Sequence, residues 1–176
     1  SVIGLAPSAA AADVLAGDLG IATENTAKWV HEHVKGPWDL TADQLVIVDE
    51  ASLAGTLTLD LLASHAAEVG AKVLLAGDPA QLAAIGAGGA FGMLVCDRNN
   101  QSDGDGAPEL ADIRRFTNTW EKTASLALRR GDTDVIDVYD EHGRIVDGEH
   151  GQMLDTAYRA WQHDTARHNG AAALQR

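Results

Sequence analysis

The stretch Gln44–Leu53, QLVIVDEASL, decides the fold of this chain, because an apolar run ends there in two adjacent acids. Four consecutive apolar residues, Leu45–Val48, are typical of a strand that is buried on both faces of a sheet. Open α/β sheets bind their ligands at the carboxyl ends of the strands. We therefore expect the carboxylates of Asp49 and Glu50 to lie at a ligand-binding edge. The alternative interpretation is a strand that ends in two solvated acids.

Two neighbouring acids at such an edge suit the hydrolysis of a nucleoside triphosphate. One carboxylate can hold Mg²⁺ through oxygen, and its neighbour can accept a proton from a water that attacks a γ-phosphate. Asp49 is the candidate metal ligand and Glu50 the candidate proton acceptor. An apolar strand followed by such a pair is the pattern of a Walker B strand, which many nucleotide hydrolases share.

A second apolar strand follows after one helix, which predicts a parallel sheet. The pattern predicts a helix over Thr56–Val69 and a strand over Lys72–Ala76, directly followed by the sequence GDPAQL. The crossover between two such strands is almost always right-handed, so both strands end at the same edge. Gly77 lets the backbone turn tightly there. Asp78 and Gln81 supply polar side chains, and the Gln81 amide can orient a water or donate to a phosphate.

Strands and helices alternate along the remaining chain, which predicts an α/β fold with helices flanking a parallel sheet. A strand over Val2–Ala6 precedes a helix over Ala9–Asp18, and Ser8 is the expected N-cap of that helix. The segment Ala22–Val34 is expected to hold a short helix capped by Thr23 or Asn25. Further along, the sequence predicts helices over 91–96, 119–130, 134–141 and 152–167, strands over 110–116 and 144–146, and an exposed loop over 97–109.

Two motifs at the predicted edge resemble those of a known family. DEAS followed by GDPAQL is similar to motifs II and III of superfamily 1 DNA helicases of the RecD-like branch. The strings GDPAQLAAIGAGGAF and RRFTNTWEKTASLALRRGD resemble the helicase region of conjugative relaxases of the TraI/TrwC (MobF) type. The similarity extends from about Val2 to Trp161. It implies a RecA-like P-loop NTPase fold that binds ATP and Mg²⁺.

The resemblance implies roles for five residues of the two motifs. Asp49 would coordinate Mg²⁺, and Glu50 would orient and deprotonate the attacking water. Gln81 would sense the γ-phosphate and pass its presence to the DNA-binding loops. Gly77 and Asp78 would lie beside the nucleotide.

Two further motifs of the family fall on other segments. Motif IV ends in an arginine finger, which the alignment puts at Arg115, with Arg114 as the alternative register. Motif Ia, which lays single-stranded DNA across a helix N-terminus, falls on Pro7, Ser8 and Ala9. An ordinary helix cap explains the same three residues without DNA.

Members of the family carry a P-loop, G-x-x-x-x-G-K-[ST], one strand before the segment that begins here. None of the four lysines, at positions 28, 35, 72 and 122, lies in that pattern. The lysine and the backbone amides that cradle the β- and γ-phosphates are therefore missing. We expect one partial RecA-like domain over residues 1–176, truncated at both ends and carrying motifs Ia, II, III and IV. Little or no ATPase activity is expected of it in isolation.

Composition agrees with one acidic globular core. The chain has 176 residues, is 45% hydrophobic and carries a net charge of −13, so it is long enough for one core but not for the two RecA-like domains of a translocating helicase. The acidic balance predicts weak non-specific affinity for DNA. The single cysteine, Cys96, excludes an internal disulfide and suits a reducing compartment. No apolar run has transmembrane length, so the expected location is cytoplasmic without a membrane partner.

The implied function is the ATP-dependent DNA helicase motor of a conjugative relaxase, which translocates on single-stranded DNA during plasmid transfer. Its partners would be single-stranded DNA, ATP and the remaining relaxase domains. Two alternatives are open: a RecD-like module that binds single-stranded DNA without hydrolysis, and a RecD-type repair helicase or exonuclease subunit. Retention of Asp49, Glu50, Gln81 and Arg115 favours hydrolysis, whereas the GAGGAF and RRF strings favour the relaxase.

Overall fold

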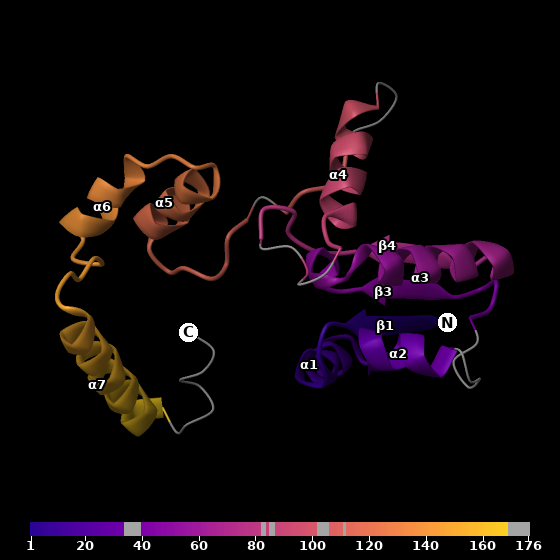
Figure 1. Ribbon diagram of the computed structural model, residues 1–176, viewed down its shortest axis with the longest axis horizontal. Helices are drawn as coiled ribbons and strands as arrows, with labels where there is room; N and C mark the ends of the chain where they lie inside the picture. The colour runs from indigo at the N-terminus through magenta and orange to yellow at the C-terminus, as the bar shows by residue number, and fades with distance from the viewer. Residues whose placement is uncertain (34–39, 82–83, 85–86, 102–105, 111, 169–176) are drawn as a thin grey trace. The chain divides into compact units, whose positions relative to one another are not determined.

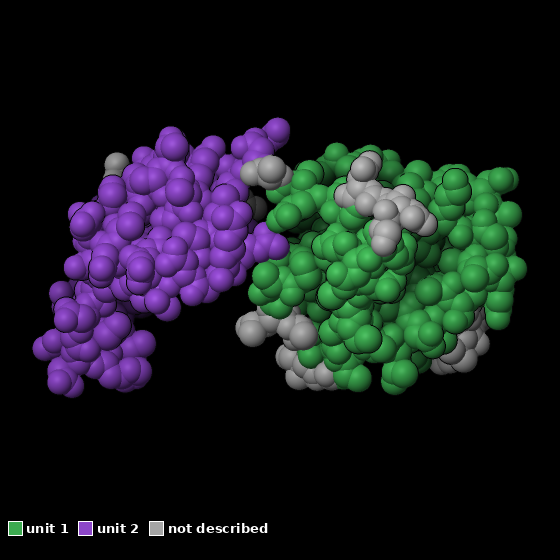
Figure 2. All heavy atoms as spheres, turned by 90° about the horizontal axis from the view of Figure 1, so that it is seen from above, with its two compact units in different colours: residues 1–110 green, residues 111–176 purple. Residues whose placement is uncertain are grey.

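The computed structural model describes residues 1–33, 40–81, 84, 87–101, 106–110 and 112–168. It divides into two compact units, Ser1–Leu110 and Ala111–Arg176, which Figure 2 colours separately. One partial domain over residues 1–176 stays a prediction from the sequence. The first unit contains the sheet, and the second consists of helices and connections in its described part.

The first unit is built on a sheet of four parallel strands in the order β2-β1-β3-β4. Figure 1 labels β1, β3 and β4 of this sheet. The predicted α/β fold with a parallel sheet is confirmed. The strands cover β1 Val2–Ala6, β2 Ala22–Asn25, β3 Leu45–Val48 and β4 Lys72–Leu75. Strands β1 and β3 have the predicted bounds, and β4 ends one residue earlier than predicted.

The order of the strands places a topological switch point between β1 and β3. The chain passes from β1 to β2 on one side and then crosses back over β1 to reach β3, so its direction of travel reverses. Ligands of open α/β sheets bind in the crevice that such a reversal leaves outside the carboxyl ends of the strands. Helices α1 Ala9–Leu19, α2 Thr26–His33 and α3 Thr56–Val69 connect the strands, with a 3₁₀ turn, η1, at Ala51–Leu53. Helix α4 Ala90–Asn100 follows β4.

The core lies on the face of the sheet that α2 and α3 cover. These helices contact each other, and their buried side chains pack against the alternate residues of β1 and β3 that point the same way. The largest fully buried side chains are those of Trp29, Leu5, Leu62, Val46 and Val48. Helix α1 covers the opposite face so closely that a Cβ at Gly4 would lie 2.8 Å from the Leu15 Cδ2 atom.

The second unit contains α5 Thr119–Arg129, α6 Val135–Glu141 and α7 His150–His168. The first two helices pack against each other, and Trp120 of α5 stacks on the ring of His142 with 3.8 Å between centroids. An ion pair of 3.1 Å joins Arg144 Nη2 to Glu121 Oε1 and ties the segment after α6 to α5. No helix among the described residues is long and apolar enough to span a membrane.

Several predicted elements of the first unit need correction. The segment Ala22–Val34 holds the predicted short helix, α2, but strand β2 before it was not predicted, because β2 is polar and lies at the sheet edge, so it lacks the apolar pattern of a buried strand. Asn25 is the cap chosen from the two candidates, since its Oδ1 accepts hydrogen bonds from the Ala27 and Lys28 amides. Helix α4 continues to Asn100, so the first four residues of the predicted loop are helical.

The second unit departs further from the prediction. No strand forms over 112–116 or over 144–146 among the described residues, because apolar content alone does not supply a neighbouring strand with which to pair. Asn118 precedes α5 as predicted, but its amide donates to the Glu121 carboxylate at 2.7 Å instead of capping the backbone. The predicted buried stripe of α7 is exposed: Leu154 is 59%, Tyr158 57% and Trp161 49% exposed. Helical spacing defines an apolar face but not the element that would cover it.

Candidate functional site

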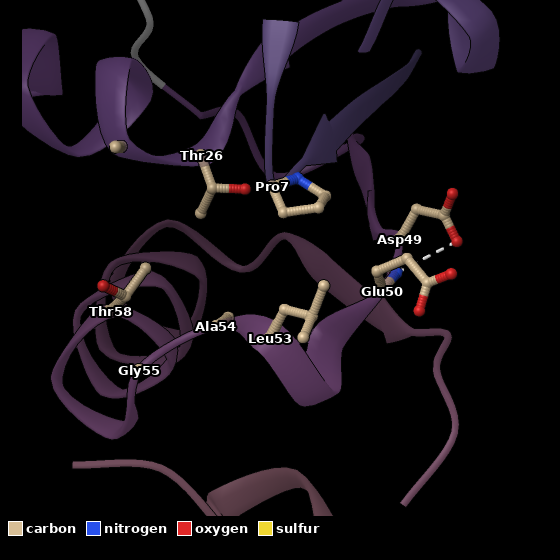
Figure 3. A pocket seen from close by; sticks show the side chains of 9 residues that line it. Pro7, Thr26, Asp49, Glu50, Leu53, Ala54, Gly55 and Thr58 are labelled. Carbon is tan, nitrogen blue, oxygen red and sulfur yellow. Dashed lines mark hydrogen bonds between the residues drawn. The ribbon is translucent and has the colours of Figure 1, made fainter. Parts of the chain in front are cut away.

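A hollow of about 210 Å³ opens at the carboxyl ends of β1 and β3, beside the switch point. The two strand ends are joined there because the Asp49 N–H donates to the Leu5 carbonyl at 2.8 Å. Figure 3 shows how residues from the β1, β3, α2 and α3 ends surround the space. Its lining consists of Pro7, Thr26, Ala27, Asp49, Glu50, Leu53, Ala54, Gly55 and Thr58.

The two predicted acids lie side by side at this hollow, and both are half-buried (Figure 3). The Glu50 N–H donates to the Asp49 Oδ1 at 3.0 Å. Glu50 has φ 49° and ψ 44°, and it is the one non-glycine residue with positive φ among the described positions. A left-handed backbone at such a residue costs on the order of 1 kcal/mol and is concentrated at functional sites. The sequence gives no signal for this conformation.

The loop after β4 packs directly against the acidic pair. The Ala51 N–H donates to the Ala76 carbonyl at 2.8 Å, and the Ala76 N–H donates to the Val48 carbonyl at 2.9 Å. A Cβ at Gly77 would lie 3.0 Å from the Ala51 nitrogen and 3.1 Å from the Ser52 nitrogen. Only a residue without a side chain allows this approach, so Gly77 joins the two predicted motifs at the level of their backbones.

Asp78 and Gln81, the polar residues of that loop, follow Gly77 in the chain and differ in exposure. Asp78 is half-buried, and its Oδ1 accepts a hydrogen bond from the Ala80 N–H at 3.0 Å. Gln81 is exposed, and its backbone N–H donates to the Asp78 carbonyl at 3.1 Å. Neither side chain lines the hollow. The roles assigned to both residues stay predictions.

The predicted arginine finger belongs to the second unit. Arg114 and Arg115 are both exposed, and the Arg114 Nε donates to the Asp112 carboxylate at 3.2 Å. A pair with 90% and 70% exposed side chains contributes little to stability. The convergence of Arg115 with the acids therefore stays a prediction.

The predicted DNA-binding residues form the turn between β1 and α1. Pro7 lines the hollow, Ser8 is the N-cap of α1, and Ala9 is the first residue of that helix. The Ser8 Oγ accepts a hydrogen bond from the Ala11 N–H at 3.1 Å, which confirms the predicted cap. A hydroxyl that accepts one hydrogen bond can still donate its own hydrogen to an anion. Pro7, Ser8 and Ala9 are all exposed, as a DNA contact requires.

Two residues that the sequence did not assign to the site hold this turn in place. The buried Thr26 Oγ1 donates to the Ala6 carbonyl at 2.9 Å, and the Asn25 Nδ2 donates to the Pro7 carbonyl at 3.3 Å. Asparagine before a helix is a recognisable cap signal, but nothing in the sequence connects Thr26 to a carbonyl twenty residues earlier.

The donor atoms of the hollow fit a magnesium ion that is shared with phosphates. The carboxylates of Asp49 and Glu50 are hard oxygen ligands, which Mg²⁺ prefers, whereas Thr58 lies at the opposite end of the lining (Figure 3). Among the described residues, no cluster of three or more His, Cys, Asp or Glu side chains is arranged to hold a metal. This donor set agrees with the usual mode of Mg²⁺, which takes one or two carboxylates and completes its shell with water and substrate oxygens.

A second hollow, of about 470 Å³, lies between α5 and α6 in the second unit. Its lining includes Trp120, Ala124, Ala127, Val135 and Val138, together with two acids that belong to the connection between the helices. None of the predicted site residues lines it. Its walls are mostly aliphatic and aromatic, which distinguishes it from the hollow at the strand ends.

Comparison with known proteins shows which proteins this chain is similar to. The AAA domain family matches residues 1–150 of this chain. The chain is 32% identical over 165 residues to the probable conjugal transfer protein TraA of Sinorhizobium fredii (strain NBRC 101917 / NGR234). It is 33% identical over 167 residues to the conjugal transfer protein TraA of Rhizobium radiobacter, and 30% over 166 residues to that of Agrobacterium fabrum (strain C58 / ATCC 33970). Each alignment covers 93% of this chain and 14% of the relative.

Proposed function

Because this chain belongs to the AAA domain family, we propose that it is part of the ATP-dependent DNA helicase motor, of RecD-like type, in a conjugative relaxase. In this proposal the motor couples ATP hydrolysis to translocation on single-stranded DNA during plasmid transfer. The observation that supports this proposal most strongly is the hollow at the switch point, whose lining contains both the acidic pair and Pro7 of the predicted DNA-binding turn. Similarity to conjugal transfer proteins supports the biological role.

The acidic pair performs the hydrolysis in this proposal. MgATP supplies a γ-phosphoryl group whose charge the metal partly neutralises. Asp49 holds the metal through its carboxylate, one oxygen of which also accepts the Glu50 N–H. Glu50, which lines the hollow with a left-handed backbone, orients the attacking water and accepts its proton.

The loop after β4 and the second unit complete the proposed machinery. Gly77 brings the loop against the backbone of the acidic turn, so a movement of the loop is transmitted to that turn without a flexible side chain between them. Asp78 and Gln81 lie on this loop, where Gln81 would respond to the γ-phosphate. Arg115 would stabilise the charge of the transferring group as an arginine finger.

Single-stranded DNA would bind at the turn between β1 and α1. Pro7, Ser8 and Ala9 are small and exposed, so a phosphate backbone can approach the start of α1 closely. The acidic surface of the whole chain, with a net charge of −13, limits non-specific attraction to nucleic acid. Local donors, rather than overall charge, therefore carry the DNA contact in this proposal.

ATP hydrolysis by the full-length protein that carries this chain tests the proposal. We expect hydrolysis that single-stranded oligothymidylate stimulates, and a loss in kcat of about 10²–10⁴-fold in Glu50→Gln, the size expected when a positioned proton acceptor is removed. Glu68→Gln is the matched control, because its side chain is 77% exposed at the far end of α3. Undiminished hydrolysis in Glu50→Gln would contradict the assigned role.

The alternative is a RecD-like module that binds single-stranded DNA without hydrolysis. The exposed small residues Pro7, Ser8 and Ala9 favour it, because they suit a phosphate contact whether or not ATP is hydrolysed. Binding of oligothymidylate by the full-length protein, together with no ATP hydrolysis dependent on Glu50, would favour this alternative over the motor.

A further inference from the structure

We infer that Asn25 and Thr26, at the junction of β2 and α2, are positioning residues that set the turn Ala6–Ser8 for a phosphate of single-stranded nucleic acid. This inference rests on the proposed function, because it concerns the same DNA-binding turn. The two side chains hold the carbonyl groups of Ala6 and Pro7, which are consecutive in the chain.

The two hydrogen bonds from the Thr26 and Asn25 side chains to the Ala6 and Pro7 carbonyls form a clamp on the turn. Thr26 supplies the buried half of this clamp. Its side chain is 7% exposed and Ala6 is fully buried, and the Oγ1 donates to the Ala6 carbonyl at 2.9 Å. A buried carbonyl that loses its partner costs about 1–3 kcal/mol, so the contact favours one orientation of the Ala6–Pro7 peptide strongly. Thr26 also lines the hollow beside Pro7 (Figure 3), and Glu50, the proposed hydrolytic residue, belongs to the same lining.

Asn25 supplies the outer half and is itself held on several sides. Its Oδ1 accepts the Ala27 N–H at 2.9 Å and the Lys28 N–H at 3.1 Å, so the side-chain amide is fixed on the first turn of α2. Its backbone N–H donates to the Glu24 carboxylate at 2.8 Å. In this fixed position the Nδ2 donates to the Pro7 carbonyl at 3.3 Å.

The geometry of the Pro7–Ser8 peptide group relates this clamp to phosphate binding. In a trans peptide the C=O and the following N–H point in opposite directions. Because Asn25 holds the Pro7 carbonyl, the Ser8 N–H of the same peptide points away from the Asn25 side chain. Both carbonyl oxygens, which would repel a phosphate, are engaged by donors, whereas the Ser8 N–H and hydroxyl remain on the exposed turn.

The test compares variants that remove one donor each. Thr26→Val keeps the shape of the side chain without its hydroxyl, Thr26→Ser restores the hydroxyl, and Asn25→Asp keeps the capping oxygen without the Nδ2 donor. The matched control is Thr23→Val, because the Thr23 Oγ1 donates to the Ala12 carbonyl at 2.7 Å inside α1 and not to the turn. All variants are made in the full chain.

Two readouts separate the inference from the proposed function. Hydrogen exchange of the peptide that contains Ser8 reports the order of the turn, and fluorescence anisotropy of labelled oligothymidylate reports the dissociation constant. We expect Thr26→Val and Asn25→Asp to speed exchange at the turn and to weaken DNA binding about two- to tenfold, the equivalent of one hydrogen bond. Thr26→Ser should restore both, and Thr23→Val should change neither.

Each outcome decides one of the two claims. If Thr26→Val and Asn25→Asp behave as Thr23→Val does while the unchanged chain binds oligothymidylate, the clamp is refuted and the proposed function stands. If the unchanged chain does not bind oligothymidylate at all, the DNA-binding role of the turn fails, whatever the exchange rates show. If Thr26→Val does not fold, the more exposed Asn25→Asp decides the question with the same two readouts.

Discussion

Replacing Gly77 by alanine should destabilise the first unit at the contact that joins the loop after β4 to the acidic turn. The new Cβ would lie 3.0 Å from the Ala51 nitrogen, 3.1 Å from the Ser52 nitrogen and 3.3 Å from the Phe91 Cε1 atom. Ordinary contacts begin at 3.4 Å, so all three neighbours would have to move by some tenths of an ångström.

The size of the effect follows from what those neighbours are. Two of the three are backbone atoms, and the Ala51 nitrogen donates the 2.8 Å hydrogen bond to Ala76 that fixes the loop. Overpacking of a well-packed site costs about 1–3 kcal/mol, and a strained hydrogen bond adds to it. We therefore expect Gly77→Ala to lower the free energy of unfolding of the first unit by about 1–3 kcal/mol.

Hydrogen exchange of a peptide spanning β3, followed as a function of urea, measures this free energy for the first unit alone. Gly17→Ala is the control, because Gly17 lies inside α1 and, apart from its chain neighbours and the backbone of its own helix, no atom is within 4 Å of the position that its Cβ would take. Alanine there should raise stability by about 0.5–1 kcal/mol through helix propensity. Opposite signs for the two substitutions support the close approach at Gly77. A Gly77→Ala chain as stable as its parent would refute it.

Three smaller predictions concern other parts of the first unit. Leu62→Ala, at a side chain that is 1% exposed in the core, should cost about 2–5 kcal/mol by chemical denaturation. Ser8→Ala should cost about 1 kcal/mol of local stability, visible as faster exchange in the first turn of α1. The Lys28 ammonium lowers the pKa of Glu24 below its ordinary value of 4.5, so the stability that this carboxylate contributes is present above that pH and is lost as pH falls through the lower folded pKa. Glu24→Gln should therefore be less stable than the parent at neutral pH, and the difference should vanish in acid titrations of unfolding.

The sequence predicts the parts of the fold in which local pattern and packing agree. The apolar run of β3 and the spacing of α3 define their bounds, because each buries a face that its own residues mark. The sequence does not predict strand β2, since this edge strand is polar and forms only because β1 lies beside it to pair with. The stripe on α7 shows the converse, because a marked apolar face stays exposed where no described element covers it.

The candidate site also contains residues that the sequence predicts and residues that it does not. The place of Asp49 and Glu50 at the hollow was predictable, because both directly follow an apolar strand whose carboxyl end lies at the ligand-binding edge, and their chemical roles stay predictions. The role of Thr26 was not predictable, because a threonine hydroxyl at a helix start has many possible partners and only the folded chain selects the Ala6 carbonyl.

At Glu50, whose backbone is left-handed, a substitution that raises thermostability would lower the proposed catalytic activity. Glycine adopts that conformation freely, so Glu50→Gly would relieve on the order of 1 kcal/mol while it removes the proposed proton acceptor. A laboratory screen that rewards heat resistance alone would therefore enrich inactive chains at this residue, and any engineering of this protein needs a hydrolysis assay alongside the melting curve.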